Sequence, residues 1–199
     1  MILEGLVTTA NPDGTVNVAP MGPRVEPAMQ QLLLRPYPGS RTAANLARTG
    51  QGVFHVTDDV ELLARAAIDR LDTLPPLLPA ATLAAGVEGW IIEDACRWYA
   101  FRVTHCDQSC EPWRLEATVV GRGRLRDFFG LNRAKHAVVE AAVLATRTAL
   151  LSAEQVLSEI ERLRAPVEKT GGPAEQRAWL LLWQHVQAAY GVEPSDAVD

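Results

Sequence analysis

The chain has 199 residues, of which 48% are hydrophobic and 22% are charged, and its formal net charge is -5. This composition excludes a disordered chain and suffices for one substantial domain with a smaller appendage. The acidic balance argues against duplex nucleic acid as the main partner, because that affinity comes mostly from Lys and Arg on phosphates. No apolar run approaches the roughly 20 residues that cross a bilayer, and the first residues lack the pattern of a signal peptide. We therefore expect a cytoplasmic protein that makes no contact with a membrane.

The first sixty residues alternate between strand-like runs and turn signals. Residues 2–10 are rich in β-branched side chains, and residues 15–19 alternate between apolar and polar ones. The sequence Asn-Pro-Asp-Gly at 11–14 lies between them and is typical of a tight turn, so these runs predict a β-hairpin. Residues 29–35 predict a third strand and residues 51–57 a fourth, with alternate side chains on opposite faces.

Helices and two longer strands are predicted further along the chain. Ser40 can cap a short helix over 41–49 that Gly50 ends. Asp58 and Glu61 have the spacing of a capping box, which predicts a helix to about residue 70. The remaining predictions up to residue 130 are a proline-rich loop at 74–79, a strand at 97–105, and a strand at 114–126 that Gly121 and Gly123 bend.

The character of the chain changes after residue 130, where no strand pattern remains. Three helical runs follow, which Asn132, Ser152 and Pro173 are placed to open. We therefore expect an α+β protein with a β-rich domain at 1–130 and a C-terminal helical extension at 131–199.

The three cysteines do not predict a disulfide framework or a metal site. They are Cys96, Cys106 and Cys110, an odd number, and their spacing matches no common zinc pattern. We expect reduced thiols and no bound metal.

Two clusters of residues could carry a binding function. In the cluster at 39–42, a loop enters the helix predicted at 41–49, and a helix N-terminus can hold an anion. Ser40 and Thr42 add hydroxyl groups, Arg41 adds a positive charge, and Arg35 at the end of the preceding strand could add another. These hydrogen-bond donors and positive charges are the groups that bind a phosphate monoester. The same residues also suit a plain helix cap beside a solvated arginine, so both interpretations stay open.

The other cluster, residues 17–22, ends a strand with Asn17, Pro20 and Gly22 and so exposes backbone groups. A flat heteroaromatic ring needs such N–H and C=O groups along its polar edge and apolar cover on its faces, for which Met21 is suited. A strand that simply ends in an irregular loop would show the same residues.

Together the two clusters resemble the flavin-binding split-barrel superfamily, which includes flavin reductase-like and pyridoxamine phosphate oxidase-like proteins. Within it, the chain is most similar to the branch catalogued as domain of unknown function 447. The resemblance covers roughly residues 1–130, and residues 131–199 look like that branch's C-terminal extension. It is carried by Val7-Thr8-Thr9, Asp13-Gly14, Asn17-Val18-Ala19-Pro20-Met21-Gly22, Gly39-Ser40-Arg41-Thr42, Asn45-Leu46, Thr49-Gly50 and Val56-Thr57-Asp58-Asp59.

The resemblance implies a split β-barrel with FMN in a barrel groove at a homodimer interface. It implies a phosphate near Ser40, Arg41, Thr42 and Asn45, and a ring against residues 17–22, Ala19 included, with Thr8 and Thr9 adjacent. Where the branch commonly has Asn, this chain has His55, whose imidazole could bind the phosphate or ribityl hydroxyls or could be structural.

The function that the resemblance implies is that of an FMN-dependent oxidoreductase of unknown substrate. The flavin would perform the chemistry, so the absence of a recognisable catalytic side chain does not count against this function. Two alternatives stay open. One is a non-catalytic flavin carrier or sensor, and the other is a binder of a different phosphorylated or pterin-like ligand.

Overall fold

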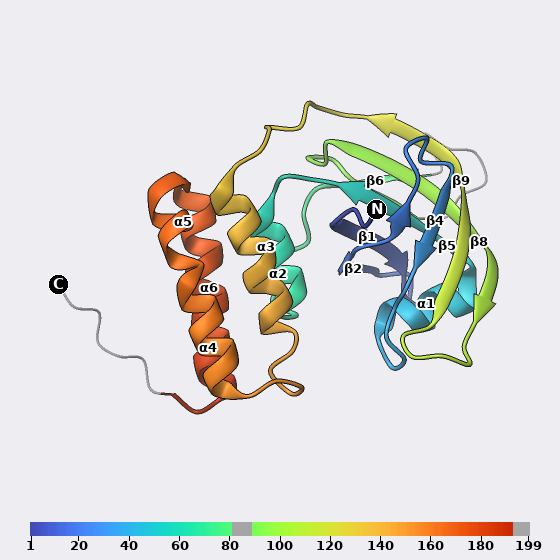
Figure 1. Ribbon diagram of the computed structural model, residues 1–199. Coiled ribbons are helices and arrows are strands. Elements are labelled where there is room, and N and C mark those ends of the chain that lie inside the picture. Colours follow the sequence, from blue (N-terminus) through green and yellow to red (C-terminus); the bar gives the residue numbers. More distant parts are fainter. Residues whose placement is uncertain (81–88, 193–199) are drawn as a thin grey trace. The chain divides into compact units, whose positions relative to one another are not determined.

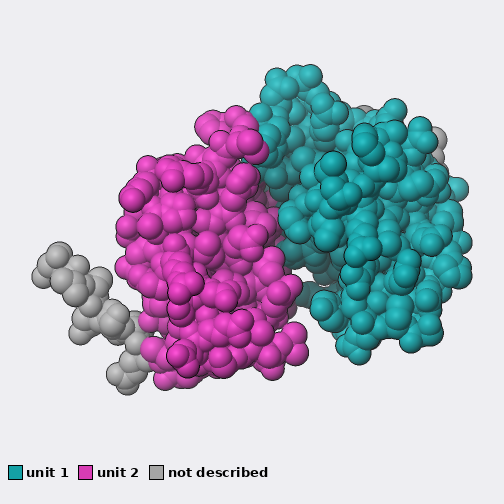
Figure 2. Space-filling view, in the orientation of Figure 1, with its two compact units in different colours: residues 1–58, 73–128 teal, residues 59–72, 129–199 magenta. Residues whose placement is uncertain are grey.

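The computed structural model describes residues 1–80 and 89–192. The chain forms two compact units, one of residues 1–58 and 73–128 and the other of residues 59–72 and 129–199 (Figure 2). Residues 59–72 therefore belong to the second unit, although strands precede and follow them in the sequence. No helix among the described residues is long and apolar enough to cross a membrane.

Seven strands of the first unit form one antiparallel sheet (Figure 1). The segment before the first strand reaches the edge strand at the other end of the sheet, because Ile2 bridges Arg24 and the Leu3 N–H donates to the Pro23 carbonyl at 3.1 Å. These contacts join the segment before the first strand to the edge strand at the far end of the sheet, so the sheet curls as in a barrel. The strands are β1 (Gly5–Ala10), β2 (Val16–Met21), β3 (Arg24–Val25), β4 (Gln31–Leu34), β5 (Gln51–Val56), β8 (Arg97–Asp107) and β9 (Arg114–Arg124), in the order β2-β1-β5-β8-β9-β4-β3.

The predicted hairpin is confirmed as β1 and β2. Gly14 adopts a φ of 83°, a conformation that favours glycine, and the Asn11 N–H donates to the Thr15 carbonyl at 2.8 Å. The register pairs Thr9 with Asn17 and Gly5 with Met21.

The helix α1 (Arg41–Thr49) begins and ends as predicted. The Ser40 hydroxyl oxygen accepts from the Ala43 N–H at 3.1 Å, and Gly50 ends the helix with a φ of 63° and donates its N–H to the Leu46 carbonyl. The helix lies at one end of the curled sheet (Figure 1), where it packs against β1 and β2.

The two faces of the sheet bury different clusters. Phe54 lies in the main core with Val7, Leu34, Leu46 and Phe101. Its neighbour Val53 points to the other face, so the alternation predicted for this strand is confirmed. The other face is covered by the antiparallel pair β6 (Leu77–Pro79) and β7 (Trp90–Ile92). The prediction of a loop was therefore wrong for 77–79, because backbone pairing with the distant β7 makes this segment a strand.

The second unit contains the remaining helices, and local caps begin three of them. Asn132 accepts from the Lys135 N–H at 3.1 Å and Ser152 from the Gln155 N–H at 3.3 Å, as the sequence predicts. The prediction that Asp58 caps the first of these helices was wrong, since Asp59 is the cap residue. The helices are α2 (Val60–Ala67), α3 (Arg133–Ala145), α4 (Ala153–Arg162), α5 (Arg164–Thr170) and α6 (Pro173–Ala189).

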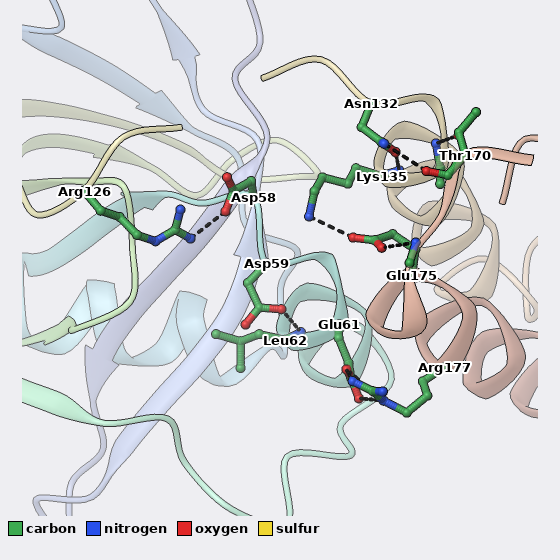
Figure 3. A network of polar contacts seen from close by, with 12 residues as sticks. Asp58, Asp59, Glu61, Leu62, Arg126, Asn132, Lys135, Thr170, Glu175 and Arg177 are labelled. Atoms are coloured by element: carbon green, nitrogen blue, oxygen red, sulfur yellow. Dashed lines mark hydrogen bonds and ion pairs between the residues drawn. The ribbon is translucent and has the colours of Figure 1, made fainter. Parts of the chain in front are cut away.

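Polar contacts join the ends of these helices. Lys135 of α3 donates to the Glu175 carboxylate of α6 at 2.8 Å (Figure 3), and the Gly172 N–H donates to the same carboxylate. Glu61 of α2 accepts from the Arg177 guanidinium at 2.7 Å, which draws α2 to α6. Lys135 and Glu175 are mostly buried, so this pair is part of the framework of the helical unit.

Candidate functional site

Four of the predicted site residues meet beneath α1. Thr9, Asn17, Thr42 and Asn45 are 0, 5, 4 and 3% exposed and come from β1, β2 and α1. The Asn17 amide donates to the hydroxyl oxygens of Thr9 at 3.2 Å and Thr42 at 3.0 Å. The Asn45 amide donates to the same Thr9 oxygen at 3.1 Å. This buried cluster fixes the first turn of α1 against the start of β2.

A surface hollow of about 510 Å³ lies beside this cluster, between α1 and the β1–β2 turn. Arg41, the first residue of α1, is exposed there, and Arg48 lies on the same side of the helix and donates to the Ala10 carbonyl. Two guanidinium groups and the positive end of a helix therefore border one hollow. Its lining residues are Asn11, Pro12, Asp13, Arg41, Ala44, Asn45 and Arg48.

Ser40 acts mainly as the cap of α1. Its hydroxyl donates to the Tyr37 carbonyl at 2.8 Å and accepts from the Ala43 N–H, so its single hydrogen is already engaged within the chain. Arg35 is exposed immediately after β4. Within the described part of the chain, no hydrogen bond joins Arg35 to the cluster beneath α1.

The second predicted cluster lies on an edge strand. β2 pairs only with β1, so every second residue of β2 directs its backbone N–H and C=O away from the sheet. Ala19, Pro20, Met21 and Gly22 are half-buried, and Pro20 is tolerated here because an edge strand does not need its N–H. Met21 packs against the main core. The accessible part of this segment is therefore its backbone edge.

Glu4 lies beside the same segment and was not identified from the sequence. A Cβ at Gly22 would lie 2.8 and 2.9 Å from the two carboxylate oxygens of Glu4, so this carboxylate lies directly against Gly22. Because Gly5 pairs with Met21, Glu4 comes next to Gly22. This neighbour could be found only once the hairpin register was known.

Thr8 and His55 face the other side of the sheet. The Thr8 hydroxyl donates to the Trp90 carbonyl of β7. The His55 Nε2 accepts from the Ile92 N–H at 3.2 Å, so the proton is on Nδ1, which donates to the Leu6 carbonyl at 3.3 Å. Burial lowers the pKa of His55 to about 4, despite the bond to Leu6. Both ring nitrogens therefore bind backbone, and the neutral imidazole has a structural role.

The arrangement suits an elongated ligand with one anionic end. Asn17 lies beneath the first turn of α1, and Met21 is four residues further along β2, which at about 3.3 Å per residue is roughly 13 Å. Segments 16–22 and 39–48 contain no carboxylate, imidazole or thiol. They can bind and orient a ligand but supply no side chain for proton transfer.

Comparisons with known families match both parts of the chain. Residues 3–126 match the model described as "Protein of unknown function (DUF447) N-terminal domain", and residues 132–184 match "Protein of unknown function (DUF447)". No curated protein matches the chain.

Several solved structures share the fold. An FMN-bound DUF447 protein from Methanosarcina mazei is 24% identical, with a TM-score of 0.74 over 92% of this chain and 94% of that one. An FMN-binding protein from Thermus thermophilus is 14% identical, with a TM-score of 0.51 over 62% and 70% of the two chains. The styrene monooxygenase flavin reductase of Pseudomonas putida S12 is 14% identical, with a TM-score of 0.50 over 63% and 82%. The predicted α+β split barrel with helical extension is therefore confirmed.

Proposed function

The chain belongs to the DUF447 family, whose two models together match most of its length, and from this premise we propose that it binds FMN and acts as a flavin-dependent oxidoreductase. The observation that carries the proposal is the hydrogen bond between Asn17 and Thr42, which joins an anion-binding helix start to an edge strand with accessible backbone. The FMN-bound relative from Methanosarcina mazei supports the choice of ligand.

The phosphate end of FMN belongs at the start of α1 in this proposal. The first N–H groups of a helix have no partner within the helix, and Arg41 adds an exposed guanidinium beside them. Thr42 and Asn45 form the buried floor of this site, and Ser40 keeps the first turn in shape. Arg48 borders the same hollow, so its lining holds two guanidinium groups against the single carboxylate of Asp13.

The ring end belongs along β2. Pro20 and Gly22 direct their backbone away from β1 and Ala19 has a small side chain, so a flat ring can approach the Pro20 C=O and the Gly22 N–H and C=O groups on this edge. Met21 and Thr9 support this strand from the core side. Thr8 and His55 act from the opposite face as structural supports and do not touch the ligand.

When bound, FMN supplies the electron-transfer chemistry that these side chains lack. The chain's own residues bind the phosphate, orient the ring along β2 and leave one face of the ring open to a substrate. Glu4 places its carboxylate beside Gly22, at the end of this segment. The substrate class is set by what can reach the ring.

A second copy of the chain completes the groove in this proposal. β2 is an edge strand, and residues 19–22 form only one side of a ring site, so another surface must cover the ring. We expect the protein to elute as a dimer when FMN is bound, which light scattering on a sizing column measures.

A cytoplasmic location is proposed because the three cysteines are free thiols.

The first experiment is the absorption spectrum of the freshly purified protein, followed by titration of the flavin-free protein with FMN. We expect a bound flavin, and Arg41→Gln should weaken FMN binding about tenfold or more by removing a charged partner of the phosphate. Arg133→Gln is the matched control, since Arg133 is likewise the exposed first residue of a helix but lies in the helical unit. Equal affinities of wild type and Arg41→Gln would contradict this phosphate site.

Rapid mixing of the flavin-loaded protein with NADH or NADPH tests the oxidoreductase part separately. Loss of the visible absorbance of oxidised flavin supports a reductase. A flavin that stays oxidised with both donors, while FMN binding remains tight, would favour a flavin carrier.

A further inference from the structure

A chain of hydrogen bonds runs from the β1–β2 turn toward α1 and begins at a carboxylate. The Thr15 hydroxyl donates to the Asp13 carboxylate at 2.6 Å, and this bond, together with the Thr15 N–H, holds the pKa of Asp13 below its usual range. Because an ionised carboxylate only accepts, the Thr15 hydroxyl must be the donor. The Thr15 oxygen in turn accepts from the Asn11 amide N–H at 2.9 Å.

The direction of donation continues into the buried cluster. Since the NH₂ group of Asn11 faces Thr15, its carbonyl oxygen faces Asn45 and accepts from the Asn45 amide at 2.8 Å. The other hydrogen of the Asn45 amide is donated to the Thr9 oxygen. The amide orientations of Asn11 and Asn45 are thus set in order from the carboxylate at the turn.

The chain ends at the first turn of α1. The NH₂ group of Asn17 donates to the Thr9 oxygen and to the Thr42 oxygen, so one lone pair of the Thr42 hydroxyl is occupied. Within residues 1–80 and 89–192, this is the only hydrogen bond of the Thr42 side chain, and its hydroxyl hydrogen has no acceptor. A buried hydroxyl whose oxygen is engaged and whose hydrogen is not presents itself to a ligand as a donor.

We propose that Asn17 fixes the Thr42 hydroxyl as a hydrogen-bond donor and thereby makes this site selective for phosphorylated flavin over riboflavin. The inference rests on the proposed function and adds a positioning residue with a specificity role. At neutral pH a phosphate monoester mainly accepts hydrogen bonds and is charged, so it is matched to a fixed donor. A terminal ribityl hydroxyl is neutral and gains less from the same donor.

The test compares the affinities of the flavin-free protein for FMN and for riboflavin, both measured by quenching of flavin fluorescence. Wild type should bind FMN more tightly than riboflavin. In Asn17→Asp, the carboxylate accepts the hydrogen of Thr42 and adds a negative charge, so the ratio of the two affinities should fall by about 10- to 100-fold. Thr42→Val should lower the ratio similarly, and Thr42→Ser should retain it.

Asn132→Asp is the matched control because it makes the same chemical change in the helical unit. Asp also serves as an N-cap, so α3 keeps its start although the hydrogen bond from the Asn132 amide to the Thr170 carbonyl is lost, and the affinity ratio should equal that of wild type. If Asn17→Asp does not fold, Asn17→Ser and Thr42→Val carry the test, and both should lower the ratio while riboflavin affinity changes little.

The possible failures can be told apart. Failure of wild type to bind either flavin overturns the proposed function and this inference with it. Tight binding of FMN and riboflavin with equal affinity overturns the inference alone. Equal loss of both affinities in the Asn17 and Thr42 variants also overturns it, because that result assigns these residues a purely structural role.

Discussion

The buried imidazole of His55 should make the stability of the first unit depend on pH in a range where few other groups titrate. In the folded chain its Nε2 accepts from the Ile92 N–H and its Nδ1 donates to the Leu6 carbonyl. Protonation of Nε2 would break the first bond and place a charge where the side chain is completely buried. The perturbation is therefore a change of pH from 7 to 5, with His55→Gln as the variant that cannot titrate.

The magnitude follows from the two pKa values. The pKa of His55 is about 4 in the folded chain against an ordinary value of 6.5, which the unfolded chain retains. The unfolded state thus binds more protons between these values, so the free energy of unfolding falls as pH falls from about 6.5 to about 4. At about 1.4 kcal/mol per pKa unit, the full loss is about 3 kcal/mol, of which about 2 kcal/mol is reached at pH 5.

Urea unfolding of wild type and His55→Gln at several pH values between 7 and 5 measures this effect. We expect the variant to be less stable at pH 7, because it loses the fit of the ring, and to lack the additional loss of about 2 kcal/mol at pH 5. The carboxylates that titrate below this range are common to both proteins and cancel in the comparison. Parallel pH dependences of the two proteins, or an NMR titration of His55 with a midpoint near 6.5, would refute the reasoning.

Two further predictions concern stability elsewhere in the chain. Ser40→Ala removes the N-cap of α1 and should lower the free energy of unfolding, measured in urea, by about 1 kcal/mol. It should weaken FMN binding less than Thr42→Val does. A large specific loss of FMN affinity would mean that Ser40 binds the phosphate directly. Lys135→Met leaves the buried Glu175 carboxylate with only the Gly172 N–H as partner and should lower the free energy of unfolding by on the order of 2–3 kcal/mol. Adding Glu175→Gln to the same chain should restore part of this loss. No loss in Lys135→Met would show that this pair does not stabilise the helical unit.

Features that depend on neighbours within a few residues were predicted from the sequence. The tight turn at 11–14 needs only Asn11, Pro12 and Gly14 in order, and the start and end of α1 need only Ser40 and Gly50. These signals are local because the hydrogen bonds that they describe span three to five residues.

Features that depend on distant partners were not predictable in this way. Asp58 has the spacing of a cap, yet it pairs with Arg126 far along the chain, which leaves the capping of α2 to Asp59. Likewise, the role of His55 depends on Ile92 of β7, a strand without a sequence signal of its own. Only the fold brings these residues together.

The candidate site shows the same division. The resemblance picked out Thr9, Asn17, Thr42 and Asn45 as a group, but it could not say that they bind one another beneath α1. Glu4 was missed because its position beside Gly22 follows from the register of the hairpin. The individual side chains could be named from the sequence, whereas the direction of their hydrogen bonds required the structure.

The most direct test of the central claim is a crystal structure of the protein with FMN. We expect the phosphate within hydrogen-bonding distance of the Thr42 hydroxyl and the Arg41 guanidinium, with the ring along the backbone of residues 19–22. FMN bound elsewhere on the chain, or a saturating concentration of FMN that leaves the start of α1 and the edge of β2 without density for the ligand, would contradict the account.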